Sequence, residues 1–450
     1  MRTGNWLVYI ATAALVLGHE AAAQVPFALS CTLTNGSFIG AVTFMDANND
    51  GKPDIISIRS STANRLYVWT NAGNGLFASN ASYAVGSFPW LAIAADVNND
   101  GKSDLITANN SGNSLTVLTN DGNGGFALSQ TVAMGSGSSP HGVAAADLFG
   151  RGHLDLVSAN SQAARVVIWT NTGAGGIFAS NTSFSIGTPQ FEVPESVTVA
   201  DMNGDGKPDI LCGGSDFSPC LFMWTNNGVG GFAAAPVPFI SDGVYWVTTP
   251  DVNGDGRPDL VLVDNPVTAT TGHVLVYTNN GSGGLILSGN YPVGPPSSIQ
   301  VLPADVNGDE MVDLIANTGG NSLTLLTNTG YGTFGSNESF TMPSGKQPFA
   351  VADINGDGRM DLIVGSANSP GTISVLTNAS TFMPRLTLKR SGTNFIVSWP
   401  AIWPNWTLQQ NTNLNTGWFS FSGTIGNDGI TKTVTNTIPT ANRFFRLSNP

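Results

Sequence analysis

The sequence predicts an all-β fold on three observations: a glycine-rich and weakly charged composition, many short apolar runs, and an internal repeat. Gly accounts for 54 of the 450 residues, and charged residues make up only 10% of the chain. Such a composition suits short strands joined by tight turns, because glycine readily adopts the positive φ angles that many turns require. With 41% hydrophobic residues the chain can also bury a large core.

The first 23 residues have the pattern of a secretory signal peptide. Arg2 precedes an apolar run over 6–18, and three alanines at 21–23 offer small residues at the cleavage positions. The run is too short to span a bilayer comfortably and no stop-transfer charges follow it, so a membrane anchor is the weaker interpretation. We expect a secreted or cell-surface mature chain that begins at Gln24 and has no transmembrane segment.

An acidic motif, Asp-x-Asn-x-Asp-Gly-x-x-Asp, recurs at intervals of about fifty residues. Its copies begin at Asp46, Asp96, Asp201, Asp251, Asp305 and Asp353, and a decayed copy begins at Asp147. Seven units of this length are typical of propeller blades and are longer than the units of most helical solenoids.

Each unit contains the same succession of strands. An apolar run such as 91–95 leads into the acidic loop, a second run such as 104–107 leaves it, and a third run ends in Thr-Asn. In six units a Gly-rich turn follows, as in 122–125, and then a weaker fourth strand. Four antiparallel strands describe a propeller blade, so the sequence predicts a seven-bladed β-propeller over 24–380.

The seventh unit ends after Asn378 and lacks a fourth strand. Residues 27–34 resemble the fourth strand of the first unit, 77–84. We expect the mature N-terminus to supply the outer strand of the last blade, which closes the ring and ties down a terminus that would otherwise fray.

The acidic motif carries the donor set of a calcium site. Calcium prefers six to eight hard oxygen ligands, and the loop at Asp201 offers Asn203, Asp205, Asp209 and the carbonyl of Lys207. Its last acid lies at position nine instead of twelve, so the loop is not an EF-hand. A single such loop could be a simple turn, but six copies with the same acids are not explained by turn chemistry, because turns need no convergent carboxylates.

The six intact loops also account for the acidic charge of the chain. They hold 18 of its 30 acidic residues, and six calcium ions would change the formal charge from −13 to about −1. The acidity therefore indicates metal sites and gives no support to a nucleic-acid partner.

Two loops depart from the motif. At Asp147 the third and fifth positions are Phe149 and Arg151, so we expect no metal there and an Arg151 bridge to Asp147 or Asp155 instead. In the loop at Asp305 the bend residue is Glu310 in place of Gly, which leaves the four ligands intact.

These motifs resemble the FG-GAP or VCBS repeats, whose members include the seven-bladed propeller of integrin α subunits. The resemblance covers about residues 27–380 and includes the Thr-Asn-x-Gly-x-Gly-x-Phe element that follows the loops. It implies about six structural Ca²⁺ ions on one face, with partner-binding loops on the opposite face. The implied ligands, with a backbone carbonyl at the seventh position, are Asp46, Asn48, Asp50, Lys52 and Asp54; Asp96, Asn98, Asp100, Lys102 and Asp104; Asp201, Asn203, Asp205, Lys207 and Asp209; Asp251, Asn253, Asp255, Arg257 and Asp259; Asp305, Asn307, Asp309, Met311 and Asp313; and Asp353, Asn355, Asp357, Arg359 and Asp361.

The segments that lead into the first strands differ between repeats and lie on the face opposite to the predicted metal sites. Variable aromatic and polar residues on a rigid scaffold fit a recognition surface, and the alternative is that they fill the central channel. The candidate ligand-binding residues are Trp90, His141, Glu195, Tyr245, Trp246 and Phe349.

Two classes of function remain open, because one fold serves adhesins, lectins and polysaccharide lyases. The leading hypothesis is an extracellular binding or adhesion protein that recognises a glycan or a protein, since no nucleophile or catalytic-metal motif surrounds His141, His153 or His273. The alternative is a polysaccharide-active enzyme such as a lyase, with His141 acting beside Glu195 or Tyr245.

The cysteines do not form a zinc site, because only three are present and no histidines cluster with them. Cys212 and Cys220 flank a turn-rich stretch. They are either a hairpin disulfide or a pair of reduced, buried thiols.

Residues 384–450 differ in composition and contain short runs typical of a small β-sandwich-like module. They resemble the C-terminal β modules appended to secreted bacterial proteins. Six basic residues against a single acid, Asp428, suit attachment to an anionic envelope or glycan, or docking on the propeller itself.

Overall fold

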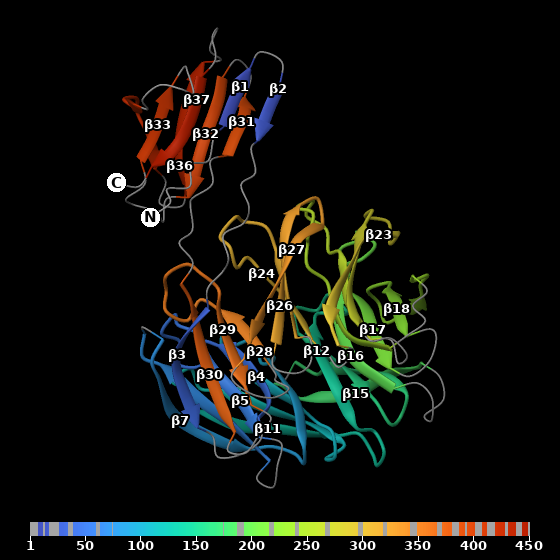
Figure 1. Cartoon of the computed structure of the whole chain (residues 1–450). Coiled ribbons are helices and arrows are strands. Elements are labelled where there is room, and N and C mark those ends of the chain that lie inside the picture. Colours follow the sequence, from blue (N-terminus) through green and yellow to red (C-terminus); the bar gives the residue numbers. More distant parts are fainter. Residues whose placement is uncertain are drawn as a thin grey trace. The chain divides into compact units, whose positions relative to one another are not determined.

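The computed structural model of the chain contains two compact units, one spanning 25–306 and 311–379 and the other including 1–24 and 380–450 (Figure 1). It describes residues 8–11, 14–17, 27–34, 39–59, 64–73, 75–173, 175–186, 193–215, 220–238, 243–265, 271–295, 300–317, 322–342, 349–366, 371–379, 387–391, 394–400, 407–411, 419–427, 431–437 and 443–448. All regular elements among them are β-strands.

The larger unit consists of seven four-stranded antiparallel sheets, which are the blades. Blade 1 contains β4 (Ile39–Met45), β5 (Asp54–Arg59), β6 (Arg65–Asn71) and β7 (Phe77–Ala84), and blade 2 contains β8 (Pro89–Ala95), β9 (Asp104–Asn109), β10 (Ser114–Asn120) and β11 (Phe126–Ala133). Blade 3 contains β12 (Pro140–Ala146), β13 (Asp155–Asn160), β14 (Arg165–Asn171) and β15 (Phe178–Ser185), and blade 4 contains β16 (Val193–Ala200), β17 (Asp209–Ser215), β18 (Leu221–Asn226) and β19 (Phe232–Ala234).

The remaining blades repeat this arrangement. Blade 5 contains β20 (Gly243–Thr248), β21 (Leu260–Asn265), β22 (Gly272–Asn279) and β23 (Leu285–Gly294), and blade 6 contains β24 (Val301–Ala304), β25 (Asp313–Asn317), β26 (Ser322–Gly330) and β27 (Thr333–Thr341). Blade 7 contains β28 (Phe349–Ala352), β29 (Asp361–Gly365), β30 (Thr372–Asn378) and, from the other end of the chain, β3 (Phe27–Thr34).

The N-terminal strand closes the ring, as the sequence predicts. β3 pairs with β30 in antiparallel register, from Phe27 opposite Asn378 to Thr34 opposite Thr372. The first strands of neighbouring blades pack against each other around the circle, and β28 of blade 7 packs against β4 of blade 1. The seven-bladed propeller is therefore confirmed, and its two ends are joined by strand pairing.

The core lies between neighbouring blades. The second strand of a blade is buried along nearly its whole length, so apolar residues follow one another in it, as in Ile55, Ile56 and Ile58 of β5. One cluster joins Trp69 of blade 1 to Ile373 of blade 7, which continues the core across the closure. Burying side chains of this size contributes roughly 1.5–3 kcal/mol each, so the blades depend on their neighbours for stability.

The smaller unit has two sheets, which fits the predicted sandwich-like module. One sheet contains β31 (Thr387–Ser391), β32 (Asn394–Pro400), β36 (Thr431–Thr437) and β35 (Gly426–Asn427), and the other contains β2 (Ala14–Leu17), β1 (Val8–Ala11), β37 (Arg443–Ser448), β33 (Thr407–Asn411) and β34 (Phe419–Ser420). Trp399 and Phe445 are buried in this unit. The strands β1 and β2 fall within the predicted signal peptide, which stays a prediction.

No helix among the described residues has the length and hydropathy needed to cross a bilayer. Cys212 and Cys220 are both buried and are not joined by a disulfide bond. Burial raises the pKa of the Cys212 thiol far above its ordinary value, so the sulfur stays protonated.

Candidate functional site

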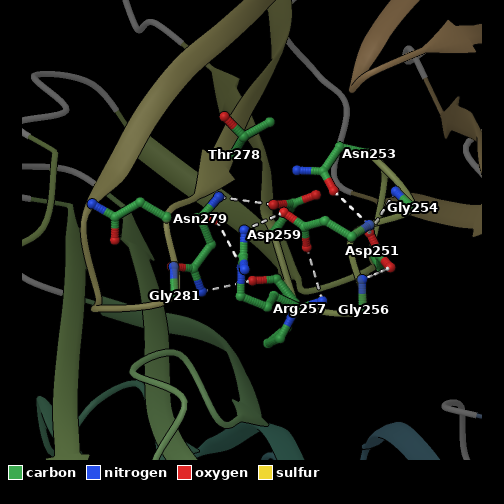
Figure 2. A network of polar contacts seen from close by, with 12 residues as sticks. Asp251, Asn253, Gly254, Gly256, Arg257, Asp259, Thr278, Asn279 and Gly281 are labelled. Carbon is green, nitrogen blue, oxygen red and sulfur yellow. Dashed lines mark hydrogen bonds and ion pairs between the residues drawn. The ribbon is translucent and has the colours of Figure 1, made fainter.

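The acidic loops form compact turns in which side-chain oxygens accept hydrogen bonds from the loop backbone (Figure 2). In blade 5, Asp251 Oδ1 accepts from the amides of Gly254 at 2.8 Å and Asp255 at 3.2 Å, and its Oδ2 accepts from Gly256 at 2.7 Å. The side-chain oxygen of Asn253 accepts from the Asp255 amide at 2.9 Å. The side chains at the first and third motif positions thus both accept hydrogen bonds from the backbone amides of 254–256.

The sixth position of the loop requires a left-handed backbone. Gly256 has a φ of 82°, and the corresponding Glu310 adopts a φ of 66°. A non-glycine residue in this region costs about 1 kcal/mol or more, so the loop at Asp305 has backbone strain at its sixth position, where the other loops have glycine.

The ninth motif position is buried and ties the loop to the third strand. Asp259 is fully buried, and its two carboxylate oxygens accept from the amides of Val252 at 2.9 Å and Asn279 at 2.8 Å. Burial raises the pKa of this carboxyl group, and the charges of Asp255 and Asp251 add to the effect. In blade 7, burial and the charges of Asp357 and Asp353 likewise raise the pKa of Asp361 to about 6.

In six blades the asparagine that ends the Thr-Asn pair of the third strand makes a contact with the preceding blade that the sequence analysis missed, whereas Asn120 of blade 2 bonds to Ser103 of its own blade. Asn279 donates from Nδ2 to the carbonyl of Met202 in the preceding blade at 2.8 Å and to that of Pro258 at 3.0 Å, and its Oδ1 accepts from Gly281. Equivalent bonds to the preceding blade join Asn71 to Ile354, Asn171 to Val97, Asn226 to Leu148, Asn328 to Val252 and Asn378 to Val306. The recurrent Thr-Asn pair was the available signal.

The donor types of the intact loops fit calcium, because each supplies carboxylate, amide and carbonyl oxygens. Within the described part of the chain, however, no three His, Cys, Asp or Glu side chains gather as a metal-binding group. The carboxylates instead face backbone amides, as in the loop at Asp251. The loops therefore hold oxygen donors of the right types close together in sequence, and calcium binding is a proposal.

The decayed third loop contains the predicted arginine bridge. Arg151 donates to the fully buried carboxylate of Asp155 at 2.6 Å, and its guanidinium lies over the Phe149 ring, 5.0 Å from the centroid. Asp147 still accepts from the loop backbone. A side-chain cation therefore occupies the place that a metal takes in the calcium hypothesis for the other loops.

At the end of the first strands opposite to the acidic loops, five blades have a β-bulge at one position within the described residues. The register with the second strand skips the bulged residue, and a bulge re-aims the side chain that it carries. The bulged residues are Gly40, Trp90, His141, Glu195 and Tyr245. Each lies six positions before the first Asp of its acidic loop, about 20 Å away along the strand.

Three bulged residues from consecutive blades touch one another, and we call Trp90, His141 and Glu195 the bulge cluster. The rings of Trp90 and His141 are stacked, with centroids 4.9 Å apart and an interplanar angle of 11°. His141 Nδ1 lies 2.6 Å from Glu195 Oε2, and Ser215 donates to Glu195 Oε1 at 3.1 Å. The structure thus brings together three of the six predicted ligand-binding residues.

Two of the other predicted residues lie against the core and outside the bulge cluster. Phe349 is 1% exposed and belongs to the core between blades 6 and 7, and Trp246 packs against the core between blades 5 and 6. Neither is a bulged residue, because Trp246 follows the bulge and Phe349 lies only four positions before Asp353. Tyr245 is bulged and half-buried.

Comparison with known proteins identifies the repeat. An FG-GAP-like repeat model matches residues 46–107, 96–158, 147–212, 201–262, 251–316 and 305–364. No curated protein sequence matches the chain.

Similar solved structures include BBS1N in complex with ARL6DN, with a TM-score of 0.55 and 12% identity over 80% of this chain and 99% of that one. Raptor of Chaetomium thermophilum has a TM-score of 0.53 and 14% identity over 80% of this chain and 29% of that one. A lectin of Agrocybe aegerita that recognises non-reducing terminal N-acetylglucosamine has 22% identity over 76% of this chain and 91% of that one, with a TM-score of 0.47.

Proposed function

The chain belongs to the FG-GAP-like repeat family, and from this premise we propose that it is a secreted, calcium-stabilised propeller that binds an extracellular glycan or protein at the bulge cluster. The observation that carries the proposal is the direct contact of Trp90, His141 and Glu195 across three blades. Large side chains of different chemistry, held rigidly at one position of a repeated scaffold, are typical of a recognition site.

The exposure of the cluster supports this role. Trp90 is 40% exposed, although most large apolar side chains of the first strands are buried. The side chains of His141 and Glu195 are each 16% exposed, so a ligand can reach them while the protein holds their positions. Partly buried polar groups beside an exposed aromatic ring combine specificity with apolar contact area.

Backbone strain next to the cluster also supports a site. Phe88 has a φ of 52°, which is an outlier for a bulky residue, and its ring lies 6.0 Å from that of Trp90. The Phe88 amide donates to Asn64 Oδ1 at 2.9 Å, so the preceding blade holds the strained turn in place. Strained residues that the surrounding structure holds in place concentrate at binding sites.

Calcium has a structural role in this proposal. Six loops would each hold one ion through the side chains at motif positions one, three, five and nine and the carbonyl at position seven. A bound cation would offset the repulsion between the carboxylates of a loop, including the buried one at position nine. The loop at Asp147 would hold none, because Arg151 already pairs with Asp155.

A polysaccharide-active enzyme remains the second candidate, because one observation favours it. A histidine whose Nδ1 contacts a carboxylate, itself held by Ser215, has the arrangement of a general base and the group that orients it. Incubating the protein with polysaccharides and measuring new reducing ends and unsaturated products would separate the two functions. Turnover that His141→Phe abolishes would replace the binding proposal by the enzymatic one.

Binding itself is tested by a screen of the calcium-loaded mature protein on immobilised glycans and extracellular proteins. We expect a ligand whose binding falls at least about tenfold in Trp90→Ala, because the exposed ring of the cluster is lost. Val229→Ser is the matched control, because Val229 is 87% exposed in a turn at the acidic-loop end of blade 4. Equal loss in both variants would contradict the assignment of the site.

A further inference from the structure

The hydrogen-bonding atoms that the bulge cluster does not use internally define the chemistry of its ligand. Both oxygens of Glu195 already take part in contacts, one with His141 and one with Ser215. The contact places a hydrogen on His141 Nδ1, because an ionised carboxylate only accepts. In the neutral ring Nε2 is then the acceptor, and it has no hydrogen-bond partner among the described residues.

The orientation of this acceptor is fixed in advance. Glu195 holds the His141 ring at Nδ1, and Trp90 stacks on its plane, so rotation of the imidazole would break one contact or both. The close approach of blades 3 and 4 limits movement further, because a Cβ on Gly142 would lie only 3.0 Å from the Val197 amide. A ligand that donates to Nε2 therefore meets a preorganised group.

The charge around the cluster disfavours an anionic ligand. Among the five described bulge positions Glu195 alone carries a permanent charge, and the neutral His141 ring that contacts it does not offset that charge. Arg59, on the second strand of blade 1, donates to the Tyr67 hydroxyl. A carboxylate or sulfate bound at contact distance would meet the Glu195 charge without a compensating cation at the described bulge positions, which should weaken its affinity more than about tenfold.

Two buried polar atoms also lie beside the cluster. Asn160 Oδ1, on the strand paired with Pro140, and Ser196 Oγ, next to Glu195, are buried and have no hydrogen-bond partner within the described structure. Orphaned polar atoms are rare in native proteins, and here two of them flank adjacent bulges.

We propose that the bulge cluster binds an uncharged, hydroxyl-rich glycan, with His141 Nε2 accepting a hydrogen bond from a ligand hydroxyl and the exposed part of Trp90 contacting the sugar ring. This assignment rests on the proposed binding function and narrows its ligand class. Glu195 is a positioning residue that fixes the histidine tautomer, and the same carboxylate selects against uronic acids and sulfated glycans.

The test measures binding of the calcium-loaded mature chain to two matched sets of soluble oligosaccharides by calorimetry. One set is uncharged (gluco-, manno-, galacto- and chito-oligosaccharides) and the other carries uronic acids (oligogalacturonate, alginate and hyaluronan fragments). We expect binding only within the uncharged set. His141→Phe keeps an aromatic ring for stacking but removes the acceptor, so it should weaken binding by about 3- to 10-fold.

A second variant separates positioning from a merely structural role. Glu195→Gln keeps a hydrogen-bonding side chain but removes the charge and the fixed tautomer, so it should weaken uncharged ligands and reduce the discrimination against uronates. A structural role alone would leave that discrimination unchanged. Thermal unfolding of each variant shows that the propeller is intact, and Val229→Ser should bind as the wild type does.

The outcomes distinguish this inference from the function on which it rests. Binding of a uronate or a protein that Trp90→Ala abolishes would overturn the ligand class but keep the binding function. Binding of uncharged glycans unaffected by Trp90→Ala and His141→Phe would overturn the site. Failure to bind either glycan set or any protein of the screen would overturn both proposals.

Discussion

At the scale of single residues, one asparagine in each of six blades links three parts of the propeller. Asn279 donates to the preceding blade and to its own acidic loop, while its backbone amide donates to the buried carboxylate of Asp259. The side chain of Asn279 is 3% exposed, so these bonds replace water contacts almost completely. Their loss would leave the Met202 and Pro258 carbonyls without this donor.

We therefore expect Asn279→Ala to lower the free energy of unfolding by about 2–4 kcal/mol, because buried acceptors lose their partner. Asn120→Ala is the matched control. Among the described contacts the side chain of Asn120 donates only to the Ser103 carbonyl in its own blade, and in the preceding loop the Ala47 carbonyl accepts from the Gly124 amide instead. Chemical denaturation measures the free energy of unfolding of both variants. An equal decrease in the two would show that the contact between blades does not contribute to stability.

The decayed acidic loop at Asp147 allows a prediction in which two substitutions create a calcium site. Phe149→Asn combined with Arg151→Asp restores the motif of the other six loops and removes the arginine bridge to Asp155. If the motif is sufficient for a calcium site, the number of ions per chain should rise by about one. Native mass spectrometry counts the ions, and an unchanged count would show that the motif does not suffice in this blade.

At the scale of elements, the strands and their order could be predicted because they repeat. The fourth strand of the last blade could also be predicted, since residues 27–34 resemble 77–84. The bulges could not be recognised, because a bulge shifts the register of a strand without requiring a particular residue type. This shift explains why the sequence could not show that Trp90 and His141 are bulged residues while Trp246 and Phe349 are not.

The contacts within the bulge cluster could not be predicted from the sequence, because they join residues that are far apart in the chain. His141 and Glu195 are 54 residues apart and meet only because blades 3 and 4 pack side by side. The acidic loops were easier to identify, because their donors lie within nine residues of one another.

Deletion of residues 24–35 tests the closing strand. Without β3 the outer edge of β30 loses its partner and the core at Trp69 and Ile373 loses cover from Cys31 and Leu33, so the melting temperature should fall by more than about 5 °C. A deletion of 24–26, which stops short of β3, serves as the control. An unchanged melt in the longer deletion would refute closure by this strand.

At the scale of the whole molecule, the account divides the propeller into two ends with different roles. The acidic loops lie at one end of the first strands, and the bulge cluster lies at the other. Calcium at the first end would hold neighbouring strands and blades in register, so the second end can present a rigid surface. Chelation should therefore weaken ligand binding even though no ion touches the ligand.

The most direct test of this account is thermal unfolding of the mature protein in calcium and in EDTA, combined with the metal content by mass spectrometry. The account predicts about six calcium ions per chain, one for each intact loop, and a melting temperature lower by more than about 10 °C in EDTA. Few bound ions and the same melting temperature in both buffers would contradict it, because the acidic loops would then stabilise the propeller through their backbone hydrogen bonds alone.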